Sequence, residues 1–258
     1  MAQVTIIDDV IILGRAVPEV ISGNRVTVCL GGYSPSLGQF IRLYPTRVKY
    51  LDGETRLRRW DIIRVEVERN PHDNRQESWK LVGSKEDWEH IEQHIEKIGR
   101  IDDANIRRQI VEENVSSCVR AIEDDRRSLG FVHPQILERG FRKNEQFDNP
   151  IQHFLFSEFD ETQWAHTKRD FEEVPYVKYR CSDCQMKQGY HQQQILEWGF
   201  FEWLRKNPDN REQVWKNAYF DDPNYDLFFF VGNQNKYRSS FLVISVIRIK
   251  KSNQRLLF

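Results

Sequence analysis

The alternation of apolar and polar positions predicts a β-rich first third of the chain. Residues 61–69, Asp-Ile-Ile-Arg-Val-Glu-Val-Glu-Arg, alternate with period two, which is typical of a strand with one solvated face. Two further β-rich runs, at 26–30 and 39–44, flank a Gly/Pro/Ser-containing stretch at 31–38 and indicate a hairpin. Several short strands at close spacing favour a small barrel or sandwich.

The period changes at Ser84. Ser84-Lys85-Glu86-Asp87 resembles a capping box, and helical spacing follows at Trp88, Ile91, Ile95 and Ile98. We therefore expect a helix that Gly99 closes, and a second helix that begins near Asp102. This acidic pair predicts a helical connector over residues 84–127.

β patterning returns beyond the connector. Strands are expected at 128–134, 136–138 and 176–180, and a buried antiparallel pair at 225–232 and 241–247. Apolar and aromatic residues at 194–206 predict a helix, and another begins near Pro208. The pattern thus predicts an α+β protein, with a barrel-like unit over 1–83, the connector 84–127, and a second β unit over 128–258 interrupted by a cysteine knuckle and helices.

Charge changes this picture only locally. The 258 residues carry a net charge of −1, which argues against a polybasic coat for nucleic acid. The charge is segregated, however: 12 Lys/Arg against 10 Asp/Glu give +2 over 1–83, and 13 against 8 give +5 over 178–258. The stretches 84–127 (8 against 12) and 128–177 (5 against 9) are each −4. Basic ends fit a local phosphate-binding surface, and ordinary scatter fits equally well.

Location is inferred from what the sequence lacks. No apolar run is long enough to span a membrane, and residues 1–9 lack the features of a secretory signal. Four Cys in a chain of this length do not make a disulfide scaffold. We expect a cytoplasmic protein without a membrane partner.

The knuckle Cys181-x2-Cys184, followed by His191, predicts a structural zinc site. Two thiolates at this spacing share one edge of a tetrahedron, and His191 supplies a third ligand. A fourth ligand is missing locally, so it would come from Asp183 or from afar: Cys29, Cys118, His153 or His166. The alternative is an unmetallated turn with two reduced thiols.

The densest basic and aromatic stretch lies at residues 42–60. Cationic side chains contact phosphates and aromatic faces stack on unpaired bases, so we predict nucleic-acid contacts at Arg42, Tyr44, Arg47, Lys49, Arg58, Arg59 and Trp60. Weaker repeats of the pattern add Lys178, Arg180, Lys236, Tyr237 and Arg238. The alternative is a solvated strand edge whose aromatic rings point into the core.

Catalytic motifs are missing. The chain contains no phosphate-binding loop, dinucleotide fingerprint, zinc-protease helix or nucleophile elbow, so no catalytic residue is predicted. Asp61, Glu66 and Glu68 resemble the acidic strand of a metal-dependent nuclease, but the Lys expected two residues after the acid is replaced.

Short motifs at both ends resemble the dual-OB-type domains of bacteria. They are Val26–Gly32 followed by Gln39–Pro45, the segment from Cys181 to His191 with its Trp198 helix, and Phe229–Asn233 before a final Phe-Leu-Val-Ile strand. The resemblance implies two small OB-like β-barrels and a role in nucleic-acid processing, often beside prokaryotic defence or mobile-element machinery.

Three hypotheses for function follow. The first is an accessory protein that binds DNA or RNA, with single strands favoured, and that has protein partners in a larger complex. The alternatives are a metal-dependent nuclease and a protein-only scaffold subunit.

Overall fold

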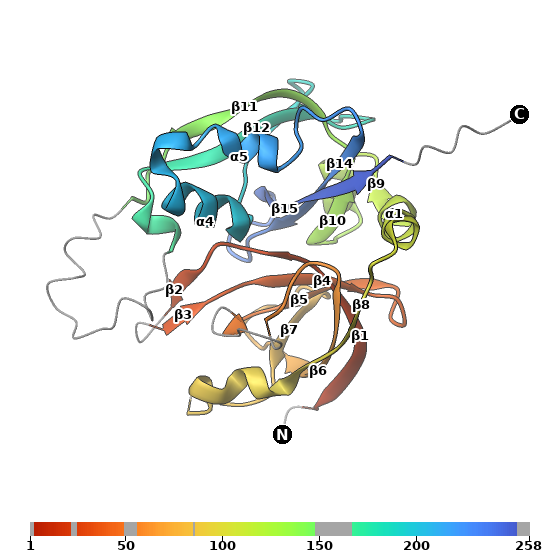
Figure 1. Ribbon diagram of the computed structural model, residues 1–258. Helices are drawn as coiled ribbons and strands as arrows, with labels where there is room; N and C mark the ends of the chain where they lie inside the picture. The colour runs from red at the N-terminus through yellow and green to blue at the C-terminus, as the bar shows by residue number, and fades with distance from the viewer. Residues whose placement is uncertain (1–2, 22–24, 49–55, 85, 148–166, 252–258) are drawn as a thin grey trace, which may run out of the picture.

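The chain forms two β-rich units that pack on each other (Figure 1). The computed structural model describes residues 3–21, 25–48, 56–84, 86–147 and 167–251. The elements of the first unit are β1 (Thr5–Arg15), β2 (Glu19–Ile21), β3 (Arg25–Thr27), β4 (Leu30–Ser34), β5 (Gln39–Leu43), β6 (Asp61–Arg69), β7 (Ser78–Leu81), η2 (Trp88–His94) and β8 (Ile95–Arg100).

Five of these strands close into a barrel. The order is β1-β4-β5-β7-β6, and β6 pairs back with β1. The first half of β1 pairs with β6 and its second half with β4, while β5 and β7 run parallel. Alternating apolar side chains fill the interior, among them Ile12, Ile41 and Val65. The first part of the chain is therefore a closed, OB-like β-barrel.

The second unit combines sheets with short helices. Its elements are α1 (Ala104–Glu113), β9 (Val115–Ser116), α2 (Val119–Asp124), β10 (Leu129–Val132), β11 (Gln135–Lys143), η4 (Lys168–Asp170), β12 (Glu173–Arg180), β13 (His191–Gln194), α4 (Trp198–Lys206), η5 (Pro208–Asn210), α5 (Gln213–Asn217), β14 (Tyr225–Asn233) and β15 (Phe241–Lys250). One sheet has the order β15-β14-β10-β9 and the other β11-β12-β13. A parallel bridge between Ile195 and Val243 joins β13 to β15. None of the helices in the described ranges is long and apolar enough to cross a membrane.

The two units share an apolar core. Ile11, Leu13 and Phe40 of the barrel pack with Phe131 and Phe230 of the second unit. Gly31 lies directly under the Phe230 ring, where a Cβ would overlap its atoms. Because burial of large rings supplies much of the free energy of association, the two units are expected to behave as one body.

Most of the predicted strands are found. β6 spans residues 61–69 as predicted, and β14 and β15 form the predicted antiparallel pair. In the predicted hairpin the first arm is β4, which starts at Leu30, and the turn is confined to residues 35–38. The helix expected over 194–206 begins only at Trp198, since Gln194 belongs to β13.

The helix predicted over 84–98 is wrong. Only a 3-10 helix, η2, forms there, and the residues that follow make β8 along the edge of β6. Ile95 lies opposite Val65 and Arg100 lies opposite Asp61. Ion pairs from Lys97 (3.2 Å) and Arg100 (2.6 Å) to the buried Asp61 carboxylate hold this edge, so long-range pairing overrides the local helical period. Part of the predicted connector thus belongs to the barrel sheet. The second helix, α1, begins near the expected residue, with Asp103 as its N-cap.

Candidate functional site

A pocket of about 370 Å³ lies where the two units meet. The barrel contributes the loop between β1 and β4, the end of β5, and the loop between β6 and β7. The second unit contributes the loop before β12, the residue Leu196 after β13, and the β14–β15 loop. The polar side chains of the lining are Glu19, Cys29, Arg42, Tyr44, Arg75, Gln146, Lys168, Asn233, Gln234, Asn235, Lys236 and Tyr237.

The charge of this lining is positive. Four cations, Arg42, Arg75, Lys168 and Lys236, line it together with one carboxylate, Glu19. Arg75 is already ion-paired with Asp73, which is not part of the lining. Burial lowers the pKa of Lys168, and Arg142 lowers it further. Such a pKa shift means that the ammonium lacks a full share of compensating negative charge. The pocket therefore offers cations that an anionic ligand would stabilise.

Arg42 is the most buried of these cations, at 5% exposure. Its Nη2 donates to the Ser128 carbonyl oxygen (3.1 Å), and its Nη1 approaches the Cys29 sulfur (3.6 Å). Its Nε has no hydrogen-bond partner among the described residues. Burial lowers the pKa of Arg42, with Glu77 opposing the shift. Arg42 thus links the barrel to the second unit, and its Nε–H group donates to no acceptor among the described residues.

The β14–β15 loop is held against the β6–β7 loop. Arg75 Nη1 donates to the backbone oxygen (2.8 Å) and the Oδ1 (3.0 Å) of Asn233. Arg238 donates to Asn74, and Asn235 donates to the His72 carbonyl oxygen at 2.8 Å.

These contacts leave the tip of the β14–β15 loop accessible. Tyr237 is 56% exposed at the mouth of the pocket, and the Nζ of Lys236 lies 5.4 Å from its ring centroid. The loop thus presents an aromatic ring and a cation side by side.

The predicted basic stretch of residues 42–60 does not form one surface. Arg42 and Tyr44 reach the pocket, where burial raises the pKa of Tyr44 and the nearby Glu19 adds to the shift. Arg47 instead pairs with Glu89 (2.7 Å) beside η2. Arg58 is exposed outside the pocket lining, and Lys49 lies outside the described residues.

Arg59 and Trp60 are both integrated into the fold. Arg59 Nη2 pairs with Glu197 at 2.7 Å, and Trp60 is only 5% exposed in the core shared by the two units. Neither side chain offers an open face to a ligand, because strand and loop geometry turn both toward the second unit.

Lys178 and Arg180 lie on β12, outside the pocket lining. The Nζ of Lys178 stacks over the Tyr190 ring at 4.2 Å, and Arg180 Nε donates to the Gly189 carbonyl oxygen at 3.0 Å. Among the weaker repeats, only Lys236 and Tyr237 line the pocket, with Arg238 on the same loop.

Three basic residues escaped the sequence interpretation. Arg75 and Lys168 line the pocket from loops with no dense basic pattern. Arg15 lies 4.9 Å from the Trp198 ring, next to the pocket residue Ala16. Burial, together with Arg56 and Arg59, lowers the pKa of Arg15 to about 10. Arg75 carries no signal in the sequence beyond its place after the predicted strand at 61–69.

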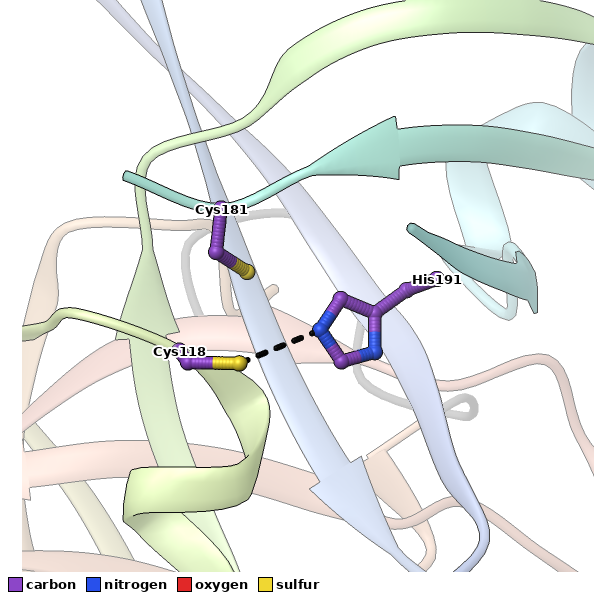
Figure 2. A group of neighbouring side chains, drawn as sticks. All are labelled: Cys118, Cys181 and His191. Atoms are coloured by element: carbon purple, nitrogen blue, oxygen red, sulfur yellow. Dashed lines mark hydrogen bonds between the residues drawn. The ribbon is translucent and has the colours of Figure 1, made fainter. Parts of the chain in front are cut away.

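A second group of functional side chains lies inside the second unit. The ligand atoms of Cys118, Cys181 and His191 lie within 4.8 Å of one another, and all three residues are buried (Figure 2). The Cys118 sulfur is 3.3 Å from His191 Nε2. Cys118 caps α2, Cys181 follows β12, and His191 opens β13. Two sulfurs and one imidazole at this separation could hold a metal ion.

Burial sets the protonation of this group. It raises the pKa of the Cys181 thiol and lowers the pKa of His191, so the imidazole is favoured in its neutral form. A neutral imidazole is the form that binds metals.

The predicted ligand set was Cys181, Cys184 and His191. Cys181 and His191 come together, and Cys118 joins them from a distant part of the chain. Cys184 is half-buried and lies outside this 4.8 Å group, although it packs on the same apolar core.

The acidic strand does not gather a metal site within the part of the chain that the structure describes. Asp61 is held by Lys97 and Arg100, Glu66 by His94 (2.8 Å), and Glu68 by Lys80. The Cys118–Cys181–His191 group is the one metal-ligand cluster found in those residues.

Comparisons with known families divide the chain at residue 113, the end of α1. Residues 7–113 match a family described as a domain of unknown function (DUF8758), and residues 113–258 match a second, described as a domain of unknown function (DUF8757). The first match covers the barrel with β8 and α1, and the second covers the remaining strands and helices. No curated protein matches the chain. Since the second match spans more than half of the residues, the chain belongs to the DUF8757 family.

Proposed function

We propose that this protein binds single-stranded nucleic acid in the pocket between its two units. The observation that carries the proposal is the position of the pocket on an OB-like barrel. Such barrels bind oligonucleotides on their second and third strands and on the loops that join strands 1–2 and 4–5. In this barrel those loops are residues 16–29 and 70–77, and they supply Glu19, Cys29 and Arg75 to the pocket, while the third strand supplies Arg42.

The second unit extends the argument, because we propose that it is also OB-like. β10 and β11 follow each other directly, and they pair with β14 and β12, as the two halves of β1 pair with β6 and β4. β13 then meets β15 through a parallel bridge, as β5 meets β7. With β10–β11 taken as one bent strand, both units have the same strand order. This match supports the dual-OB-type resemblance.

The two units then contribute equivalent loops to one pocket. The loop between strands 1 and 2 of the second unit supplies Gln146 and Lys168, and the loop between its strands 4 and 5 supplies Lys236 and Tyr237. A ligand in the pocket would therefore touch the binding loops of both units at once.

The chemistry of the lining suits a nucleotide. Phosphate oxygens would accept from Arg42, Lys168 and Lys236, and an unpaired base could stack on the exposed ring of Tyr237. A pocket of about 370 Å³ lies within the range of small-ligand sites, roughly 300–1,000 Å³. A base paired in a duplex would keep its faces stacked, so single strands are favoured.

Fluorescence polarisation of labelled oligonucleotides tests the proposal. We expect oligo-dT or oligo-U to bind at low salt, with an affinity that falls steeply as salt rises, and a duplex of equal length to bind more weakly. Comparing the affinities for oligo-dT and oligo-U shows whether the protein prefers DNA or RNA. No binding of any strand at low salt would overturn the proposal and favour a scaffold role in a larger complex.

We also propose that the Cys118–Cys181–His191 cluster holds a structural Zn²⁺. Thiolate and imidazole ligands in a buried, closed environment favour this ion over the oxygen-preferring Mg²⁺ and Ca²⁺. All three ligand residues are buried away from solvent, so we assign the ion a role in stabilising the fold. Elemental analysis of the purified chain should give about one zinc per molecule, and well under one would contradict this assignment.

A further inference from the structure

The turn of the knuckle is hydrogen-bonded to the short segment between β9 and α2 that carries Cys118. Between Cys181 and Cys184 lie Ser182 and Asp183. The hydroxyl of Ser182 and the backbone N–H of Asp183 both donate to the carbonyl oxygen of Ser117, each at 3.2 Å. Ser117 directly precedes Cys118. Both residues of the turn therefore hold the knuckle against the cysteine that the structure adds to the cluster.

Cys184 approaches the same cluster from the end of this turn. It is half-buried and packs against the core that contains Cys118 and Cys181. Two cysteines three positions apart on a tight turn commonly occupy one edge of a tetrahedral site.

Other candidates for a fourth ligand are engaged elsewhere. The Tyr179 hydroxyl, which lies beside His191, donates to Gln193 Oε1 at 2.8 Å. Cys29 lines the pocket between the units, and the His133 ring stacks on Phe228 at 4.9 Å. His153 and His166 lie outside the described residues. Asp183 is exposed, so Cys184 is the remaining candidate in the knuckle.

We propose that Cys118, Cys181, Cys184 and His191 form a single four-ligand zinc site. This inference rests on the zinc proposal above and adds its fourth ligand. On binding, three thiols each release a proton to solvent, and three Zn–S bonds and one Zn–N bond form without oxidation or reduction. Structural zinc sites are closed and tetrahedral in this way, with Cys₃His among their common ligand sets.

A backbone donor points at the cluster. The backbone N–H of Arg120 donates to the Cys118 sulfur at 3.4 Å. Hydrogen bonds of this kind orient metal ligands and offset the negative charge of a Cys₃His site. The ion would join the start of α2 to the end of β12 and to the start of β13.

Cobalt substitution of the full-length chain tests the fourth ligand. Co²⁺ replaces Zn²⁺ in tetrahedral sites, and its thiolate-to-metal charge-transfer absorption scales with the number of Co–S bonds. We expect Cys184→Ser to lose about one third of this absorption per bound cobalt, because two of three thiolates remain. Cys29→Ser is the matched control and should keep the full absorption.

The outcomes separate the two proposals. Failure of the wild-type chain to bind Co²⁺ or Zn²⁺ would overturn the zinc assignment itself. Full charge-transfer absorption in Cys184→Ser, with a metal-loaded wild type, would exclude Cys184 and leave the three-ligand cluster standing. Cys184 is half-exposed, so its serine variant is expected to fold. Circular dichroism of the apo and loaded forms verifies this, and an unfolded variant is replaced by Cys184→Ala in the same titration.

Discussion

Arg59 and Glu197 form an ion pair across the junction of the two units, with 2.7 Å between Nη2 and Oε1. Arg59 precedes β6 of the barrel, and Glu197 is the N-cap residue of α4. The other carboxylate oxygen of Glu197 accepts from the Val246 N–H at 2.6 Å and from the Ser245 hydroxyl at 3.3 Å. Arg59 also donates to the Val246 carbonyl oxygen at 2.8 Å. One buried carboxylate thereby ties α4, β15 and the barrel together.

Glu197→Gln should destabilise the protein substantially. The amide keeps the shape of the side chain but leaves the buried Arg59 guanidinium without its counter-charge, a loss worth about 3–5 kcal/mol for buried pairs. Urea unfolding followed by tryptophan fluorescence measures the change. Glu202→Gln on the same helix is the control, and since its partner Arg205 is a surface i,i+3 pair, the change should stay below about 1 kcal/mol. Equal effects in the two variants would contradict a special role for Glu197.

The same carboxylate predicts an acid-sensitive stability. Burial by itself raises the pKa of Glu197, but Arg59, Arg248 and the Val246 N–H outweigh it, and the net pKa is lowered from the ordinary 4.5. The unfolded chain therefore binds the proton more readily than the folded chain. This part of the stability is complete above pH 4.5 and is lost as the pH falls through the lowered folded pKa.

The difference in unfolding free energy between wild type and Glu197→Gln isolates this effect from other carboxylates. We expect the difference to be constant between pH 6 and 8 and to shrink below pH 4.5. A difference that stays constant down to pH 3 would show that Glu197 does not titrate with folding.

Gly31→Ala should weaken the packing of the two units. The added methyl group would overlap the Phe230 ring, which is fixed between Phe40 and Phe131. Overpacking of this kind costs about 1–3 kcal/mol. Gly99→Ala serves as the control, because its Cβ would meet Ile62 at an ordinary 3.7 Å. Thermal unfolding of both variants measures the effect, and equal melting temperatures would contradict tight packing at Gly31.

Sequence periodicity predicted strands where burial alternates within one element. β6 was found for that reason, whereas the buried β14–β15 pair was found from two continuous apolar runs. The stretch after Ser84 has the apolar spacing of a helix. Lys97 and Arg100 instead form ion pairs with Asp61, and residues 95–100 form an edge strand. No window of local sequence contains that interaction, so the error has a long-range cause.

The candidate site was only partly predictable for the same reason. Spacing identified Cys181 and His191, but Cys118 lies 73 residues before His191 and is brought in by the packing of α2. Residue type identified Arg42, Tyr44, Lys236 and Tyr237, but not that they meet in one pocket. The dense basic and aromatic stretch at 42–60 also predicted contacts by Arg59 and Trp60. The structure buries both residues at the junction between the units.

Lys168 and Lys236 should determine the salt dependence of nucleic-acid binding, and Tyr237 should contribute independently of salt. Each lysine that contacts a phosphate releases about one counterion, so Lys168→Ala and Lys236→Ala should each lower the slope of log K against log salt by about one unit. Tyr237→Ala should weaken single-strand binding by about 1–3 kcal/mol with the slope unchanged, because stacking releases no counterion.

Fluorescence polarisation over a salt series measures both quantities. Lys206→Ala, an exposed lysine at the end of α4 and outside the pocket lining, is the matched control and should leave slope and affinity as in the wild type. These exposed or half-buried positions are better probes than Arg42, because replacing Arg42 would also break its bond to Ser128 and disturb the junction between the units. If Lys206→Ala lowered the slope as much as Lys236→Ala, binding would be a diffuse surface effect and the pocket would not be the site.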